Sequence, residues 1–138
     1  MSKLNNDYYL AVPFTVNENK HLERAIKAYR FEVANIYASA LMRENYKVYS
    51  PISHSYPISL SGGLPVTWEY WKEVDEVAIN ICNELIVLCL DGWGESVGVM
   101  GEIEMFNNQD KTITFINPLE TTPEMLLDTI KLRATQSE

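Results

Sequence analysis

The chain has 138 residues, of which 46% are hydrophobic, and its 19 acidic and 11 basic residues leave a formal net charge of -8. This length suits one domain with a hydrophobic core, so a single domain over residues 1–138 is predicted. The acidic excess argues against a nucleic-acid polymer as partner, because such binding depends on clustered cations that neutralise phosphates. With no apolar run near the roughly 20 residues of a membrane span and no signal-peptide pattern, we expect a cytoplasmic protein without a membrane partner.

The first half of the chain alternates apolar runs with an amphipathic segment. DYYLAVPF at residues 7–14 predicts a strand stopped by Pro13, and apolar residues spaced i, i+3, i+4 and i+7 predict a long helix over residues 19–45. YKVYS at residues 46–50 predicts a second strand. Residues 51–66 contain three prolines and two adjacent glycines, which predict a long loop that serves as a lid or a substrate wall.

The second half predicts three helices and two strands in strict alternation. They are expected at residues 67–81, 84–90, 97–108, 111–117 and from Thr122 onward. ELIVLCL at residues 84–90 indicates a fully buried strand, because polar and apolar residues do not alternate in it. The order of all these elements predicts a parallel sheet with right-handed crossovers and helices on both faces.

One carboxylate falls on the apolar side of a predicted helix. On the helix that begins after Thr67, Asp75 lies inside the apolar arc, beside Trp71 and Cys82. An ionised carboxylate buried there without partners would cost several kcal/mol or would take up a proton. Asp75 either caps the backbone N–H groups of a loop or is a carboxyl with a raised pKa, available for acid or base chemistry.

Glycines and a carboxylate follow the third predicted strand, in DGWGESVGVMGE at residues 91–102. Ser96 stands at the predicted helix start, where a hydroxyl can cap the helix or bind an anion together with free N–H groups. The glycines allow backbone to approach a ligand closely. Glu102 and Glu104 border the apolar arc on opposite sides, and periodicity does not choose between them. The GxGxxxG spacing is neither the dinucleotide fingerprint nor a Walker A loop.

Other chemistry has little support in the sequence. His21 and His54 have no Cys or second His at metal-ligand spacing, so neither a metal nor another cofactor is expected. No GxSxG motif is present to make a serine hydrolase. His54 is either a substrate contact or a solvated loop residue. Trp68, Trp71 and Trp93 are able to stack on a base, although core packing is the alternative for Trp68 and Trp71.

Ligands of parallel sheets bind outside the carboxyl ends of the strands. Pro13 and Phe14 follow the first predicted strand, and the glycine-rich stretch follows the third. Together with the family resemblance given next, which selects Glu102, this rule leads us to expect Asp75, Ser96 and Glu102 to line one cleft at this edge of the sheet, with Phe14 and His54 on its walls.

These motifs, in this order, resemble the nucleoside 2-deoxyribosyltransferase-like superfamily. YYLAVPF at the first strand, Asp75 eight residues before Asn83, and SVGVMGE ending on Glu102 carry the resemblance over roughly residues 7–118. SPISHSYPI, the GGLP turn and GWGESVGV are most similar to a small bacterial and phage branch. The resemblance implies a Rossmann-like (flavodoxin-like) α/β fold with four to five parallel strands, and a homodimer or higher homo-oligomer.

The resemblance also implies a reaction. Glu102 matches the nucleophile that attacks the anomeric carbon of a nucleoside or nucleotide, and Asp75 matches the aspartate that protonates or hydrogen-bonds the leaving base. Ser96, six residues before the nucleophile, implies a substrate with a 5′-phosphate, which Ser96 and Gly98 would hold. The remaining expected substrate contacts are Phe14, Pro13, His54 and Trp93.

The expected function is therefore hydrolysis or transfer at the N-glycosidic bond through a covalent glycosyl-glutamate intermediate. Glu102 is expected to stay ionised, close to the helix start, and Asp75 to be the more readily protonated. The alternative is a nucleotide-binding or sensing domain without turnover. VPFTVN stands where the monophosphate hydrolases of this superfamily have an arginine-containing turn, and this difference favours the alternative.

Overall fold

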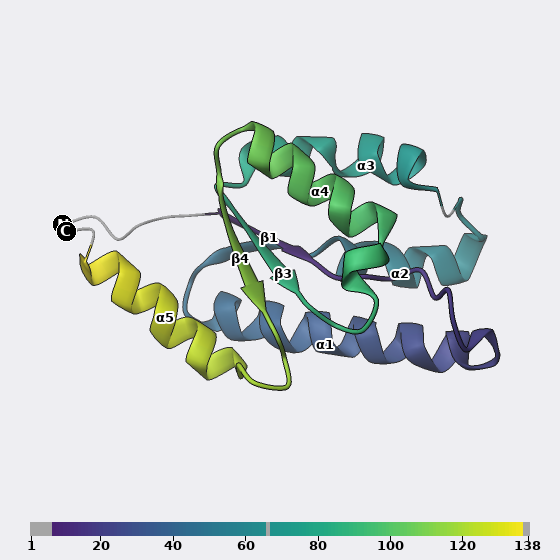
Figure 1. Ribbon diagram of the computed structural model, residues 1–138, viewed down its shortest axis with the longest axis horizontal. Helices are drawn as coiled ribbons and strands as arrows, with labels where there is room; N and C mark the ends of the chain where they lie inside the picture. Colours follow the sequence, from purple (N-terminus) through teal and green to yellow (C-terminus); the bar gives the residue numbers. More distant parts are fainter. Residues whose placement is uncertain (1–6, 66, 137–138) are drawn as a thin grey trace.

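The computed structural model describes residues 7–65 and 67–136. Its sheet has four parallel strands in the order β2-β1-β3-β4 (Figure 1). The strands are β1 (Asp7–Ala11), β2 (Lys47–Tyr49), β3 (Glu84–Leu88) and β4 (Thr112–Ile116). The chain thus has the predicted Rossmann-like α/β fold, and the strand order is the flavodoxin-like one.

β1 lies in the middle of the sheet and fixes where a ligand is expected. Tyr8 of β1 pairs with Val48 of β2 on one side and with Glu84 of β3 on the other. The connection from β1 leads to one side of the sheet, and the later strands are added on the other side. Sheets of this kind bind ligands where the strand order reverses in this way, at the carboxyl ends of the strands.

Helices cover both faces of the sheet, as predicted. They are α1 (Glu23–Arg43), α2 (Pro51–Gly62), α3 (Trp68–Ile81), α4 (Val97–Asn108) and α5 (Pro123–Gln136), with short 3-10 turns η1 (Lys20–Leu22) and η2 (Trp93–Glu95). In Figure 1, α3 and α4 lie on one face and α1 and α5 on the other. Alternation along β1 serves both layers, because Tyr8 and Leu10 belong to the core under α1 and α5, whereas Tyr9 and Ala11 belong to the core under α3 and α4.

The prediction of a long loop over residues 51–66 is wrong, because most of that segment is the helix α2. Pro51 is in its first turn, where the missing N–H of proline costs nothing, and Gly63 ends it with a left-handed φ of 62°. Pro57 lies inside the helix. The three prolines were thus a misleading signal, since Pro51 favours a helix start rather than a loop.

The other predicted elements are present with small shifts at their ends. The predicted strand over residues 7–14 ends at Ala11, and the long helix begins at Glu23 after a 3-10 turn. The last helix begins at Pro123 as expected, and the hydroxyl of Thr122 accepts a hydrogen bond from the N–H of Met125. In the described part of the chain, no helix has the length and apolar character needed to cross a membrane.

Candidate functional site

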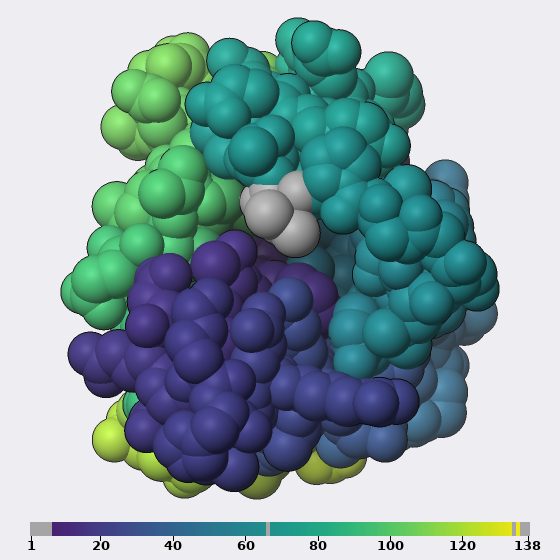
Figure 2. Space-filling view, turned by 90° about the vertical axis from the view of Figure 1, so that its right-hand side faces the viewer, coloured from purple at the N-terminus to yellow at the C-terminus, as the bar shows by residue number. Residues whose placement is uncertain are grey.

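A cavity of about 270 Å³ lies beyond the carboxyl end of β1, between α2, α3 and the start of α4. Figure 2 looks onto this end of the molecule, where the segment after β1 (purple), α2 and α3 (teal) and α4 (green) meet. Five predicted site residues line the cavity: Phe14, Asp75, Ser96, Gly98 and Glu102. The prediction that Asp75, Ser96 and Glu102 share one cleft at this edge of the sheet is therefore confirmed.

Glu102 provides one of two buried carboxyls in the cavity. Its side chain is 6% exposed, and its Oε2 accepts a short hydrogen bond from the hydroxyl of Tyr9. Tyr9 reaches it because the alternation of β1 directs this side chain toward the layer of α3 and α4. Glu104 is exposed to solvent. The structure thus decides between the two glutamates that periodicity left open.

Asp75 provides the second carboxyl. It is 3% exposed, which confirms that it lies on the buried side of α3, and its Oδ1 accepts a hydrogen bond of 2.9 Å from the hydroxyl of Tyr49. The Tyr9 hydroxyl also lies near the charge of Asp75, so that one tyrosine is close to both carboxyls. Among the described residues, no ion pair neutralises either Asp75 or Glu102.

Burial raises the pKa of both carboxyls. Burial and the nearby charge of Asp75 raise the pKa of Glu102 to about 8, against the effect of the Tyr9 hydrogen bond. Burial also raises the pKa of Asp75, against the hydrogen bonds of the tyrosines and the charge of His54. The expectation that Glu102 stays ionised is therefore wrong for the unliganded protein near neutral pH. Glu102 lies beyond the first turn of α4, where the helix dipole no longer stabilises a carboxylate.

Ser96 is the N-cap of α4, as predicted. Its hydroxyl oxygen accepts a hydrogen bond of 3.2 Å from the N–H of Val99, and its side chain is buried at the cavity wall. This cap anchors the start of the helix that carries Glu102. Contact between Ser96 and a substrate phosphate stays a prediction.

The glycines of α4 make room for an aromatic side chain. A Cβ at Gly101 would lie 2.5 Å from the indole of Trp68, and Gly98 faces the same ring at 3.9 Å. Trp68 therefore packs directly on α4. The sequence suggested that a ligand approaches the backbone of these glycines closely, but the indole of Trp68 occupies that position. Gly98 still contributes to the cavity wall.

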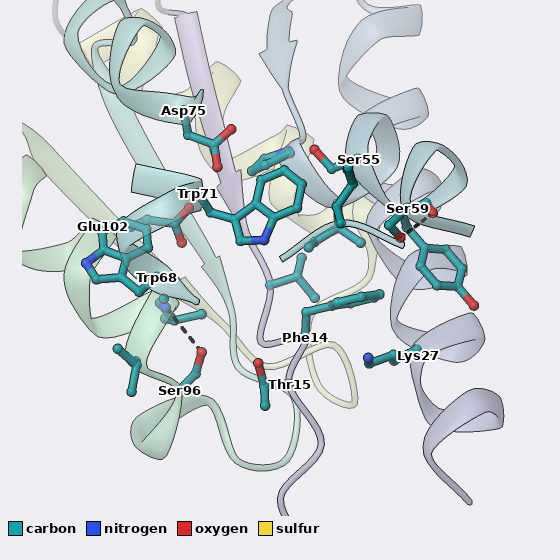
Figure 3. A pocket seen from close by; sticks show the side chains of 18 of the residues that line it. Phe14, Thr15, Lys27, Ser55, Ser59, Trp68, Trp71, Asp75, Ser96 and Glu102 are labelled. Carbon is teal, nitrogen blue, oxygen red and sulfur yellow. Dashed lines mark hydrogen bonds between the residues drawn. The ribbon is translucent and has the colours of Figure 1, made fainter. Parts of the chain in front are cut away.

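Aromatic rings form much of the remaining wall (Figure 3). Trp68 and Trp71 both line the cavity, and the Nε1 of Trp71 donates a hydrogen bond of 2.9 Å to the carbonyl of Pro65. Phe14 packs edge-on against Tyr56 of α2, with ring centroids 5.1 Å apart. The sequence left core packing and ligand stacking open for the two tryptophans, and their place on the wall supports stacking.

Three predicted substrate contacts, Pro13, His54 and Trp93, are not among the described residues that line the cavity. Pro13 is fully buried, and Trp93 packs against Phe115 with ring centroids 5.5 Å apart. His54 is exposed, because the segment predicted as a loop is helical and turns Ser55, rather than its neighbour, toward the cavity. In the same described part of the chain, no group of three His, Cys, Asp or Glu side chains is placed to hold a metal ion.

A buried arginine ties together the two loops that flank the cavity. Arg30 of α1 donates hydrogen bonds to the carbonyl of Thr15, after β1, at 3.2 Å and to that of Asp91, after β3, at 2.8 Å. Gly92 follows with a φ of 84°, a left-handed conformation that favours glycine. Both of its partners are backbone carbonyls, so Arg30 holds in place the loops that lead to Phe14 and to the start of α4.

Sequence analysis missed Lys27, which lines the cavity, and two tyrosines, Tyr9 and Tyr49, whose hydroxyls hydrogen-bond the two carboxyls of the cavity. For Tyr9 a signal existed, because a tyrosine in a strand buried on both faces needs a partner for its hydroxyl. Tyr49 gave no such signal in a short edge strand. Lys27 gave no signal either, because the residues around it in α1 are mostly exposed to solvent. Its place at the cavity depends on its tertiary contact with Phe14.

Comparison with known proteins gives a family but no activity. A search of curated proteins found no match to the chain. Residues 6–117 match the model of a family described as Domain of unknown function (DUF1937). The match extends over most of the chain and includes every residue discussed above for the cavity. The protein therefore belongs to the DUF1937 family.

Proposed function

We propose that this protein cleaves the N-glycosidic bond of a nucleoside or nucleoside 5′-monophosphate through a glycosyl intermediate on Glu102. The observation that carries the proposal is the pair of buried carboxyls, Asp75 and Glu102, which face one cavity and are each hydrogen-bonded by a tyrosine. Breaking a glycosidic bond through an oxocarbenium-like transition state requires two such groups, one facing the sugar and one serving the leaving group.

The grouping of the carboxyls supports a covalent route. The Tyr9 hydroxyl hydrogen-bonds Glu102 and is near the charge of Asp75, so the two carboxyls are grouped around one tyrosine. Retaining glycosidases place their two carboxyls roughly 5–5.5 Å apart, whereas inverting enzymes leave a wider gap for a water molecule. The grouping of the two carboxyls around Tyr9 fits direct attack by Glu102, as in the retaining enzymes.

The two steps use only side chains of the cavity. In the first, an ionised oxygen of Glu102 attacks the anomeric carbon, the bond to the base nitrogen breaks, and protonated Asp75 gives its proton to the leaving base. In the second, water attacks the same carbon, the bond to Glu102 breaks, and ionised Asp75 takes the proton of the water. A second base in place of water gives transfer. The Tyr9 hydroxyl stabilises the carboxylate of Glu102 before attack and after release.

The size of the cavity supports a small nucleoside-like ligand. Its volume of about 270 Å³ is close to the lower end of the roughly 300–1,000 Å³ that is usual for small-molecule sites. A mononucleotide suits this volume better than a dinucleotide does. Trp71 and Phe14 offer apolar rings for the base or the sugar.

One observation favours the alternative of a binding or sensing domain without turnover. The pKa of Glu102 is about 8, so in the unliganded protein near neutral pH this carboxyl is mostly protonated and is not a nucleophile. Catalysis then requires Glu102 to lose its proton when substrate binds or as the pH rises. A nucleotide that binds in the cavity but stays intact between pH 6 and 9 would support the binding domain.

The experiment that tests the function is incubation with nucleosides, their 5′-monophosphates and NAD, followed by chromatography for free base. Intact-protein mass spectrometry of the same mixtures should show a glycosyl adduct in the parent protein and none in Glu102→Gln. The exposed neighbour provides the control, because Glu104→Gln should retain both the adduct and the release of base. Equal losses in the two variants would show that Glu102 is not the nucleophile.

The proposal includes a homodimer in the cytoplasm. Exposed apolar residues of α3 provide some support for a self-association surface, namely Val74, Val77 and Ile81 beside the edge strand β2. The free thiols of Cys82 and Cys89 fit a reducing compartment. Sedimentation of the parent protein and of Val77→Glu tests the dimer, since a charge on this face should produce monomers.

A further inference from the structure

The cavity carries opposite charges on two of its walls. Asp75 and Glu102 lie on one side, and Lys27 of α1 lies on the other, with Trp71 and Phe14 between them (Figure 3). Lys27 and Lys20 are the cationic side chains among the described residues that line the cavity. A ligand that fits both walls therefore has an anionic group at a distance from the atom that the carboxyls face.

Lys27 is held in place at the cavity rather than extended into solvent. Its ammonium lies 2.9 Å from the carboxylate of Glu23 and 5.3 Å from the ring centroid of Phe14, and its side chain is 22% exposed. Lys20 lies 3.9 Å from the same carboxylate. The hydrogen bond and charge of Lys27 lower the pKa of Glu23, so this carboxylate is ionised at neutral pH.

Glu23 is an exchangeable partner for these lysines. It lies one helical turn from Lys27, and ion pairs of this kind near the surface contribute little to stability. A phosphate dianion carries more charge than a carboxylate and offers more acceptor oxygens to the three N–H donors of an ammonium. Phosphate therefore competes well with Glu23 for Lys27.

The start of α4 is a poorer place for the same phosphate. The hydroxyl oxygen of Ser96 already accepts the N–H of Val99, and Glu102 lies on this wall of the cavity. A phosphate bound there would approach a carboxyl that must become ionised for the reaction, and no cation among the described lining residues offsets that repulsion on this side.

We propose that Lys27, assisted by Lys20, binds the 5′-phosphate of the substrate, and that Glu23 occupies Lys27 until the phosphate displaces it. This inference rests on the proposed function and specifies its substrate class as a nucleoside 5′-monophosphate. Specificity then comes from the cationic wall, and the sugar is oriented with its anomeric carbon toward the carboxyls.

The experiment compares Kd for a 5′-monophosphate and for the matching nucleoside in the parent protein, Lys27→Met and Lys131→Met. Methionine keeps the length of the apolar stem that packs near Phe14. Lys131 is a matched control, because its ammonium also lies 2.9 Å from a carboxylate, that of Glu44, outside the cavity. Lys27→Met should raise the Kd of the monophosphate by about tenfold or more and change the Kd of the nucleoside by no more than about twofold. Lys131→Met should change neither Kd.

Two further variants complete the test. Glu23→Gln should lower the Kd of the monophosphate by a few fold, because the competing carboxylate is gone. Ser96→Ala should leave the ratio of the Kd values of the monophosphate and the nucleoside unchanged. Loss of monophosphate preference in Ser96→Ala but not in Lys27→Met would overturn the inference and place the phosphate at α4. A parent protein that binds both ligands equally would also overturn it while leaving the proposed function intact. Binding of neither ligand would remove the proposed function, and this inference with it.

Discussion

Replacing Glu102 by glutamine should stabilise the fold at neutral pH while it abolishes turnover. Burial raises the pKa of this carboxyl from an ordinary value of 4.5 to about 8. Below pH 4.5 the folded and unfolded chains both hold the proton. Between 4.5 and about 8 the unfolded chain loses the proton and the folded protein keeps it, so the free energy of unfolding decreases as the pH rises. Above about 8 the effect is complete.

The magnitude follows from the width of that interval. Each pH unit corresponds to about 1.4 kcal/mol, so the full interval corresponds to about 5 kcal/mol and the part below pH 7 to about 3 kcal/mol. Glutamine has no charge to lose, but its buried amide N–H groups need partners, which costs about 1–3 kcal/mol. We therefore expect Glu102→Gln to be more stable than the parent protein by up to about 2 kcal/mol at pH 7, and by more at pH 8.

Urea unfolding followed by circular dichroism from pH 5 to 8.5 measures this difference. The free energy of unfolding of the parent protein should decrease with pH more steeply than that of Glu102→Gln, by about 1.4 kcal/mol per pH unit. Glu104→Gln is the control and should keep the slope of the parent, because Glu104 is exposed. Parallel slopes for the parent protein and Glu102→Gln would refute the assignment of Glu102 as a buried acid with a raised pKa.

Three other predictions test the contacts around the cavity. The parent kcat/KM should rise with pH as Glu102 ionises and fall again where Asp75 loses the proton that the leaving base needs. Tyr9→Phe should move the rise to higher pH and lower kcat/KM at pH 7 by about tenfold, because the hydrogen bond that favours the carboxylate is lost. An unshifted rise would show that Tyr9 has only a packing role. Arg30→Met should lower the free energy of unfolding by about 2–4 kcal/mol in a urea titration, since two backbone carbonyls lose their donor; a change under about 0.5 kcal/mol would contradict this. Gly101→Ala should cost about 1–3 kcal/mol in the same assay, because its methyl group would overlap the neighbouring indole ring, whereas Gly94→Ala meets open space and should cost little.

Asp75 shows how much of the site local sequence can predict. The helical period of 3.6 residues places a side chain on a face whatever the rest of the chain does, so a carboxyl within an apolar arc is predicted to be buried wherever the helix packs. The cap at Ser96 follows from equally local geometry, because a hydroxyl at a helix start meets N–H groups within three residues of itself.

Glu102 and α2 show where local reasoning ends. Both glutamates of α4 border its apolar arc, and only the position of Tyr9 on β1 makes one of them a cavity residue and leaves the other in solvent. In α2, the three prolines predicted a loop because each was weighed as a helix breaker, whereas Pro51 lies in the first turn, where it is favourable. The sequence shows which residues are prolines, but it does not show where each proline lies relative to the ends of the helix.

The sequence by itself determined the order of the helices and strands other than α2, the parallel α/β class, the burial of Asp75 and the start of α4 at Ser96. These depend on periodicity and capping, which act over a few residues. The tertiary structure decided the order of the strands in the sheet, the choice of Glu102 over Glu104, the hydrogen bond from Tyr9 to Glu102 and the position of Lys27 on the opposite wall of the cavity. Each of these joins segments far apart in the chain, and which distant segments meet depends on the packing of the whole core rather than on any local pattern.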